Sequence, residues 1–295
     1  MKRTSVLYAA LAGGVMMLSA SGIFSKLAAA PPAIIAFYRL FITAAVLFPW
    51  VMLHPRRRRE IFRPDRRNFS LCATAGFFLA AHYVMWISSI GFTSVSCATV
   101  LAALQPIFNM FWGRLLLHEK VSRRSVVGCA VAIAGTLLIG GGDFRISEAA
   151  LWGDALALLS GAVISLYFLS GQMARRKMGA LTYSFLSYGA GAVFLALYGF
   201  FRGNSFIGYG RATWACFFAL ALISTIGGQM VFNFLLRWLS ATTVTAGILG
   251  EPLGTCVLAM IFLGEKLTPQ LAAGMAVIGA GLALFFGGKN EMTAN

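Results

Sequence analysis

Long apolar runs separated by short polar stretches dominate the pattern of this chain. Ten runs reach the length of about 20 residues that a helix needs to cross about 30 Å of hydrocarbon. Because lipid offers no partner for an open backbone edge, such runs are expected to be helices. The pattern predicts an all-α integral membrane protein with ten transmembrane helices, over about residues 5–27, 33–53, 69–90, 94–117, 124–142, 150–172, 181–201, 212–235, 241–263 and 268–288.

The overall composition agrees with a chain that lies mostly in lipid. Its 295 residues are 59% hydrophobic and only 11% charged, whereas soluble domains average about 45–50% apolar and about 25% charged residues. A net charge of +15 would suggest nucleic acid as the partner of a soluble protein. Here the basic residues lie between apolar runs, so we expect contacts with anionic lipid head groups at the cytoplasmic face and no nucleic acid.

The basic residues also predict the orientation of the chain. The longest polar stretch, His54 to Asn68, holds seven arginines, and cytoplasmic loops carry the excess of Lys and Arg in membrane proteins. With that stretch inside, ten crossings place both termini in the cytoplasm. Eighteen basic residues then lie inside and five outside, with Arg39 within a span. We therefore expect a multi-pass protein of the inner (plasma) membrane.

The second half of the chain repeats the first, as residues 5–143 and 150–288. Each half holds five predicted spans, an odd number, so the two halves must cross the membrane in opposite directions. Inverted repeats are typical of secondary transporters, which bind substrate near the midplane between the halves. At an offset of 146 residues, the pairs that decide the match are Gln105-Pro106 with Glu251-Pro252, Glu119-Lys120 with Glu265-Lys266, Gly128 with Gly274 and Gly135 with Gly281.

These motifs carry a family resemblance over nearly the whole chain. Each repeat has a proline followed after twelve residues by Glu-x-Leu/Val-Ser/Thr and then a glycine-rich run, beginning at Pro106 and at Pro252. This pattern, with Pro32 and Arg39 around the second span, resembles the EamA type of the drug/metabolite transporter superfamily. The resemblance implies transport of a small organic solute; its members move amino acids, nucleosides, vitamins and drugs. The chain departs from the pattern at His118, where the second repeat has glycine.

Glu251 is the sharpest candidate for a functional residue. It lies near the middle of the ninth predicted span, directly before Pro252, and a carboxylate there costs about 2.5–3.5 kcal/mol on insertion scales. It could exchange protons and so couple transport to a gradient, or it could pair with an amino-bearing substrate. The alternative is a structural group beside a helix kink, since a proline frees a carbonyl about one turn back.

Two further pairs of polar residues share helix faces within the spans. Gln105 and Asn109 are separated by one turn, as are Gln229 and Asn233 in the eighth span. Each pair alone is compatible with hydrogen bonds between helices, worth about 0.6 kcal/mol each. Because the repeat makes Gln105 equivalent to Glu251, we expect the pairs to converge on a polar cavity at the midplane.

Aromatic residues and one arginine complete the predicted substrate site. His82 and Trp86 share a face of the third span and Tyr167 lies mid-span in the sixth, so they could form an aromatic wall for a flat organic substrate; core packing is the alternative. Arg39 lies within the second span. It could bind an anionic substrate, balance the charge of Glu251, or extend outward to the membrane surface.

No catalytic constellation is visible in the sequence. It contains no HExxH, GxSxG or phosphate-binding loop, and its five cysteines lie in apolar runs without a CxxC pair. We therefore expect no enzyme, cofactor or metal site. The prediction is a secondary active exporter of a small organic metabolite, amino-acid-like compound or drug, working by alternating access around a midplane cavity. An importer or facilitator of the same fold is the alternative, followed by a membrane-embedded enzyme or sensor.

Overall fold

A computed structural model describes residues 2–62, 65–93, 95–119, 121–140, 148–263 and 269–287. All regular structure in these segments is helical, and η1 has π-helical hydrogen bonding. The elements are α1 (Lys2–Ser19), α2 (Ser21–Leu27), α3 (Pro32–Met52), α4 (Pro55–Phe62), α5 (Arg66–Ser89), α6 (Val95–Ala102), α7 (Gln105–Leu117), α8 (Arg123–Gly140), α9 (Glu148–Arg175), α10 (Ala180–Phe201), α11 (Arg211–Ala219), η1 (Leu220–Gln229), α12 (Met230–Leu235), α13 (Ala241–Ile248), α14 (Glu251–Leu263) and α15 (Pro269–Phe286).

Seven helices in the described segments are long and apolar enough to cross a membrane. They correspond to seven of the ten predicted spans. The other three predicted spans fall on α8, on α13 followed by α14, and on α15, which are shorter or interrupted helices. The all-helical membrane fold is therefore as predicted, whereas ten crossings stays a prediction.

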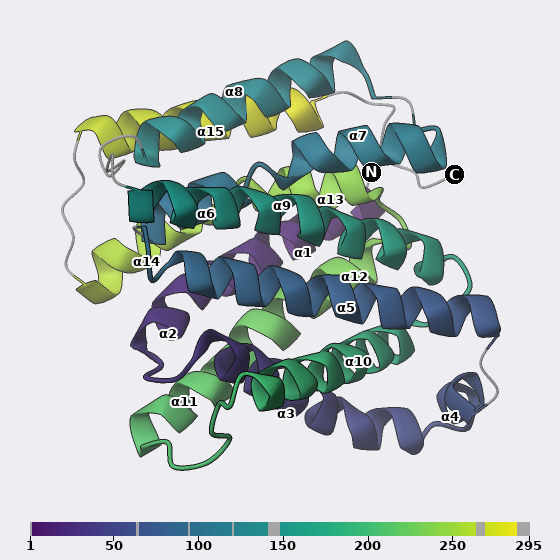
Figure 1. Ribbon diagram of the computed structural model, residues 1–295. Coiled ribbons are helices and arrows are strands. Elements are labelled where there is room, and N and C mark those ends of the chain that lie inside the picture. Colours follow the sequence, from purple (N-terminus) through teal and green to yellow (C-terminus); the bar gives the residue numbers. More distant parts are fainter. Residues whose placement is uncertain are drawn as a thin grey trace.

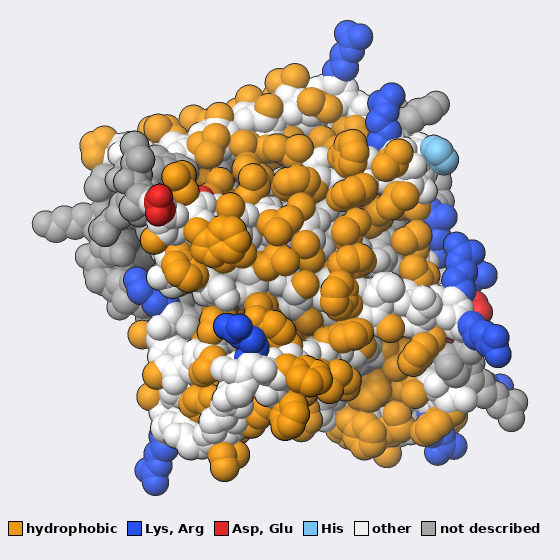
Figure 2. Space-filling view, viewed as in Figure 1, with side chains coloured by type: hydrophobic (Ala, Val, Ile, Leu, Met, Phe, Trp, Pro, Cys, Tyr) orange, Lys and Arg blue, Asp and Glu red, His pale blue; other side chains and the backbone are white. Residues whose placement is uncertain are grey.

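The molecular surface is divided into an apolar side and a basic edge. Figure 2 shows hydrophobic side chains across the face that α5, α9 and α10 form, and Lys and Arg side chains along the edge that holds α4. Large apolar residues such as Leu151 (60% exposed) and Phe194 (38%) face outward there. Apolar surface of this extent is stable when lipid covers it.

Contacts between the two halves follow the symmetry of the repeat. Corresponding helices touch one another: α8 lies along α15, and α3 lies along α10 (Figure 1). Other contacts occur in equivalent pairs. The contact of α5 with α9 corresponds to that of α1 with η1 and α12. The contact of α7 with α9 corresponds to that of α14 with α1. A two-fold relation between the halves requires such a pattern, so the contacts fit the two-repeat fold.

Helix interruptions occur at equivalent positions in both repeats. The helix α6 ends at Ala102 and α7 begins at Gln105, while α13 ends at Ile248 and α14 begins at Glu251. In both cases a proline is the second residue of the new helix, where its missing N–H costs no helical hydrogen bond. The interruptions place Gln105 and Glu251 at helix starts inside the protein, as in the discontinuous helices of other transporters.

Glycines allow α8 and α15 to touch along their backbones. A Cβ atom on Gly281 would lie 2.3 Å from the nitrogen of Ala132 and 2.7 Å from the carbonyl oxygen of Gly128. A Cβ on Gly135 would lie 2.9 Å from the carbonyl oxygen of Gly274. Small residues permit such close approach between membrane helices. The 146-residue offset of the repeat converts each of these contacts into the other, so the contact between α8 and α15 is itself symmetric.

We expect Gly281→Val to destabilise the protein strongly, whereas Gly279→Val is tolerated. The added side chain of the first variant overlaps the α8 backbone, which cannot move aside as a flexible side chain can, and overpacking costs about 1–3 kcal/mol or more. Gly279 lies on the same helix with no atom within 4 Å of its Cβ position. Thermal unfolding of the purified variants in detergent checks this; equal midpoints would contradict the close contact between α8 and α15.

Candidate functional site

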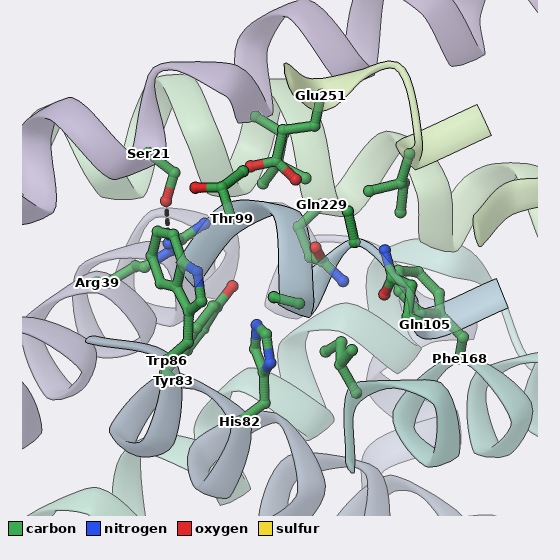
Figure 3. A pocket seen from close by; sticks show the side chains of 15 residues that line it. Ser21, Arg39, His82, Tyr83, Trp86, Thr99, Gln105, Phe168, Gln229 and Glu251 are labelled. Carbon is green, nitrogen blue, oxygen red and sulfur yellow. Dashed lines mark hydrogen bonds between the residues drawn. The ribbon is translucent and has the colours of Figure 1, made fainter. Parts of the chain in front are cut away.

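A closed-in cavity lies among helices from both halves of the chain (Figure 3). The centre of a water molecule can occupy about 50 Å³ of it, which is room for roughly three to five waters. A larger solute therefore requires the helices to move apart. Six of the nine side chains predicted for the site line this cavity: Arg39, His82, Trp86, Gln105, Gln229 and Glu251.

Arg39 points into the protein rather than toward the membrane surface. It is only 1% exposed; its Nε donates to Thr225 Oγ1 at 2.8 Å and one terminal nitrogen donates to Ser21 Oγ at 2.6 Å. The other terminal nitrogen is buried without a partner, and the guanidinium lies 4.3 Å from the ring centroid of Tyr83. The outward orientation considered from the sequence is thus excluded, and a buried donor remains free beside the cavity.

Glu251 presents an unpaired carboxylate to the same cavity. Its backbone carbonyl accepts hydrogen bonds from Ser19 and Thr255, each at 3.0 Å. Its carboxylate has no hydrogen-bond or ion-pair partner among the described residues, Arg39 included. The backbone at this position is therefore held firmly while the acid group stays available. A carboxylate that only stabilised helix contacts would have its own partners.

Two amide side chains lie on another wall of the cavity. Gln105 is 5% exposed and Gln229 is 4% exposed, and Figure 3 shows both between Glu251 and Phe168. The Gln229 Nε2 group has no hydrogen-bond partner in the described part of the chain. Gln105 begins α7 and Gln229 ends η1, so one comes from each repeat. An amide carries both donors and an acceptor, so this wall can contact neutral polar groups.

Aromatic residues of α5 form the wall opposite Glu251. His82 and Trp86 stack at a centroid separation of 6.4 Å and an interplanar angle of 13°. His82 Nδ1 lies 3.1 Å from the carbonyl oxygen of Ser160 on α9, while Trp86 and Tyr83 are buried. The predicted shared face of His82 and Trp86 is therefore present and faces the cavity.

The other three predicted residues lie outside the cavity wall. Tyr167 donates to Asn233 Oδ1 at 2.7 Å, and Asn233 Nδ2 donates to Ser184 and Tyr188, each at 3.0 Å. Asn109 is fully buried and its amide donates to the carbonyl of Gln105 at 3.3 Å. Residues four positions apart share a face but lie about 6 Å apart along the axis. The second member of each predicted pair therefore falls beyond the small cavity; Asn233 bonds to neighbouring helices, whereas Asn109 bonds to its own helix.

Several cavity residues were not predicted from the sequence. The wall also contains Ser21, at the start of α2, and Tyr83, Thr99 and Phe168. Hydroxyl and aromatic residues are common within apolar runs, so neither pattern nor charge distinguishes them. The repeat gives a weak signal only for Thr99, which corresponds to Thr245.

Glu119 connects the two halves at the end of α7. Its carboxylate accepts from Gln172 at 2.5 Å and from Thr242 at 3.4 Å, and Gln172 also accepts from the backbone N–H of Ala241. These contacts bring the loop after α7 to the end of α9 and the start of α13. Glu119, which the sequence singles out as part of the repeat motif, thus forms a contact between the repeats. The corresponding Glu265 lies outside the described residues.

His118, where the chain departs from the family pattern, ends helix α7 beside this contact. Its φ of 54° is in the left-handed region, the only positive φ of a residue other than glycine in the described segments. A helix commonly ends in this conformation, for which glycine is preferred because it has no Cβ. A glycine would be less strained at this position, and the histidine adopts the conformation at a cost of about 1–2 kcal/mol.

The family assignment follows from a comparison with family models. The EamA-like transporter family matches residues 5–141 and again residues 151–287. The chain belongs to this family. The resemblance drawn from the proline and Glu-x-Leu/Val-Ser/Thr motifs is confirmed, and the chain is a multi-pass membrane protein of a transporter family.

Named relatives are similar at low identity. An uncharacterized transporter of Bacillus subtilis, YxxF, is 25% identical, with 95% of this chain and 90% of the relative covered. A probable terminal-alkyne amino-acid exporter of Streptantibioticus cattleyicolor is 26% identical over 75% of this chain and 74% of its own. The threonine/homoserine exporter RhtA of Escherichia coli K12 is 34% identical over 58% and 59%.

The fold also matches a solved protein structure. A crystal structure superposes with a TM-score of 0.75 at 16% identity and covers 95% of this chain and 96% of its own. At this identity the likeness concerns the fold alone. It supports the arrangement of helices described above.

Proposed function

We propose that this EamA protein is a secondary active exporter of a small amino-acid-like solute. One observation carries the proposal: Arg39, with one unbonded guanidinium nitrogen, and Glu251, whose carboxylate has no partner among the described residues, line one cavity between the two repeats. Charged groups inside a membrane are costly and commonly mark a substrate path. A solute that bears both a carboxylate and an ammonium group supplies a partner for each.

In this proposal the two charges divide the recognition of the solute. The free nitrogen of Arg39 donates to the carboxylate, while Glu251 pairs with the ammonium group. Names of two relatives, the threonine/homoserine exporter and the probable amino-acid exporter, agree with such a solute and with export. The limited volume of the cavity favours a small metabolite over a large drug.

Glu251 also offers a route to proton coupling. A carboxylate cannot hold a proton and pair with an ammonium group at the same time, so the two compete for it. A proton that arrives from the outer side releases the solute outward, and the proton then leaves on the cytoplasmic side. Alternating access opens and closes the contact of Glu119 with Gln172 and Thr242, which joins the two halves at one end.

Transport in proteoliposomes tests the proposed function. Purified protein is reconstituted in vesicles loaded with radiolabelled neutral amino acids, and a pH gradient is imposed. We expect solute movement that depends on the gradient and leaves the solute chemically unchanged. Absence of movement for every amino acid tested, with folded protein in the membrane, would refute the proposal; chemical conversion would favour an enzyme.

The proposal places the protein in the inner membrane with both termini in the cytoplasm. Reporter fusions at Arg57 and Arg145 should then report opposite compartments, with Arg57 cytoplasmic, because the stretch around Arg57 holds seven of the 24 Lys and Arg residues. The same stretch includes α4 and is expected to contact anionic lipid head groups. Fusions that report the same compartment would show that the order of crossings is wrong.

A further inference from the structure

A backbone carbonyl determines which ring nitrogen of His82 carries the proton. Its Nδ1 lies 3.1 Å from the carbonyl oxygen of Ser160. A carbonyl oxygen only accepts hydrogen bonds, so the proton of the imidazole must be on Nδ1. In the neutral ring the second nitrogen, Nε2, therefore carries a lone pair and acts as an acceptor.

The acceptor nitrogen of His82 faces the cavity. Figure 3 shows the ring extending from α5 into the space below Glu251, and among the described residues the ring bonds to Ser160 alone. Trp86 stacks on the ring and restricts its rotation. In the proposed complex the solute's ammonium group balances the charge of Glu251, so a second positive charge beside Arg39 is unfavourable and the ring stays neutral. Nε2 is thus an oriented acceptor without a partner.

The amides in the cavity lack this fixed polarity. Gln105 and Gln229 carry both a donor and an acceptor, and rotation of the amide group exchanges them. They can adapt to a donor or to an acceptor on the solute. His82 cannot, because the Ser160 carbonyl would have to lose its bond before the ring could turn over. Of these three polar side chains, His82 alone discriminates by the direction of its hydrogen bond.

We infer that His82 is a specificity-determining residue that selects solutes whose side chain carries an O–H or N–H donor. The inference rests on the proposed function, since Arg39 and Glu251 hold the two charged groups and direct the side chain toward α5. A hydroxylated amino acid such as threonine satisfies Nε2. Valine has nearly the same shape but leaves Nε2 buried and unpaired, at a cost of about 1–3 kcal/mol, so threonine is preferred about 5- to 150-fold.

The test compares transport of threonine and valine in proteoliposomes. We expect the wild-type protein to prefer threonine in direct competition, and His82→Phe to bring the preference close to one while valine is still moved. His82→Gln restores an acceptor and should recover part of the preference. Ser89→Ala is the matched control, because it removes a buried hydroxyl from the same helix outside the cavity wall; it should keep the wild-type preference.

Two outcomes overturn the inference, and a third concerns the function. Wild-type transport without a preference, or a preference that His82→Phe leaves unchanged, means that His82 only packs against Ser160 and Trp86. Failure of the wild-type protein to move any neutral amino acid refutes the proposed function, and the inference falls with it; movement of other amino acids but not of threonine overturns the inference alone. If His82→Phe does not fold, ¹⁵N NMR of the wild-type imidazole decides: threonine, but not valine, should shift the Nε2 resonance, and equal spectra overturn the inference.

Discussion

Glu251→Gln is expected to abolish gradient-driven transport while the protein still folds and inserts. The amide has almost the same shape as the acid, and the backbone bonds from Ser19 and Thr255 to the carbonyl of residue 251 are retained. It cannot bind and release a proton, and it gives no ion pair with an ammonium group. A charge-assisted hydrogen bond is worth about 1.5–3 kcal/mol, so we expect at least about a tenfold loss.

The measurement separates coupling from binding. Uptake is recorded with an imposed pH gradient, and solute exchange is recorded without one. Glu251→Gln should lose the first and keep part of the second through Arg39 and the amides; Glu251→Asp, which keeps the acid, should retain gradient dependence. Glu265→Gln is the equivalent change in the motif after the span and should stay more active at equal expression. A wild-type rate and pH dependence for Glu251→Gln would show that the carboxylate is structural.

Most of the helical fold could be predicted because apolar run length reports the cost of exposing backbone to lipid. The breaks before Gln105 and Glu251 also had a signal, since each precedes a proline. The break between α1 and α2 and the π-helical turns of η1 had none. They reflect hydrogen-bond register and packing against neighbouring helices, which average hydropathy does not measure. Likewise α4 is helical within a stretch interpreted only as a charged loop.

The site could be predicted where a residue was expensive to bury. Arg39 and Glu251 stand out in any apolar run, and both reach the cavity. The i, i+4 spacing correctly predicted which residues share a helix face, but it did not predict how far along the helix the cavity extends. Asn109 and Asn233 therefore lie beyond the cavity, where each makes other hydrogen bonds. The acceptor role inferred for His82 depends on a carbonyl of another helix, which no local pattern contains.

Breaking the repeat is what gives the cavity its chemistry. Strict symmetry would place two glutamines or two glutamates at the starts of α7 and α14, but the chain has Gln105 and Glu251. Two acids close to a pseudo-two-fold axis would repel one another. One acid, Glu251, set against one arginine in the same cavity, Arg39, gives the cavity a negative and a positive side. An asymmetric solute with two opposite charges then has one preferred orientation.

Arg39→Gln is expected to weaken binding of a carboxylate-bearing solute about ten- to hundredfold, which corresponds to about 1.5–3 kcal/mol for the lost charge-assisted bond. The methyl ester of the same amino acid should bind almost equally well to the variant and to the wild type, because it has no carboxylate to lose. Arg39→Lys keeps the charge but not the planar fork, so it should retain part of the discrimination. Competition of acid and ester for transport measures the ratio.

A matched variant separates this role from a structural one. Arg39 also joins α2, α3 and η1 through Ser21 and Thr225, so its loss could reduce stability alone. Thr225→Val removes one of these bonds without touching the cavity wall and should keep the acid-to-ester ratio even if the unfolding temperature falls. If Arg39→Gln also keeps the wild-type ratio, then the guanidinium is a cross-link between helices. The carboxylate would then be bound elsewhere, and the proposed division of charges between Arg39 and Glu251 would be wrong.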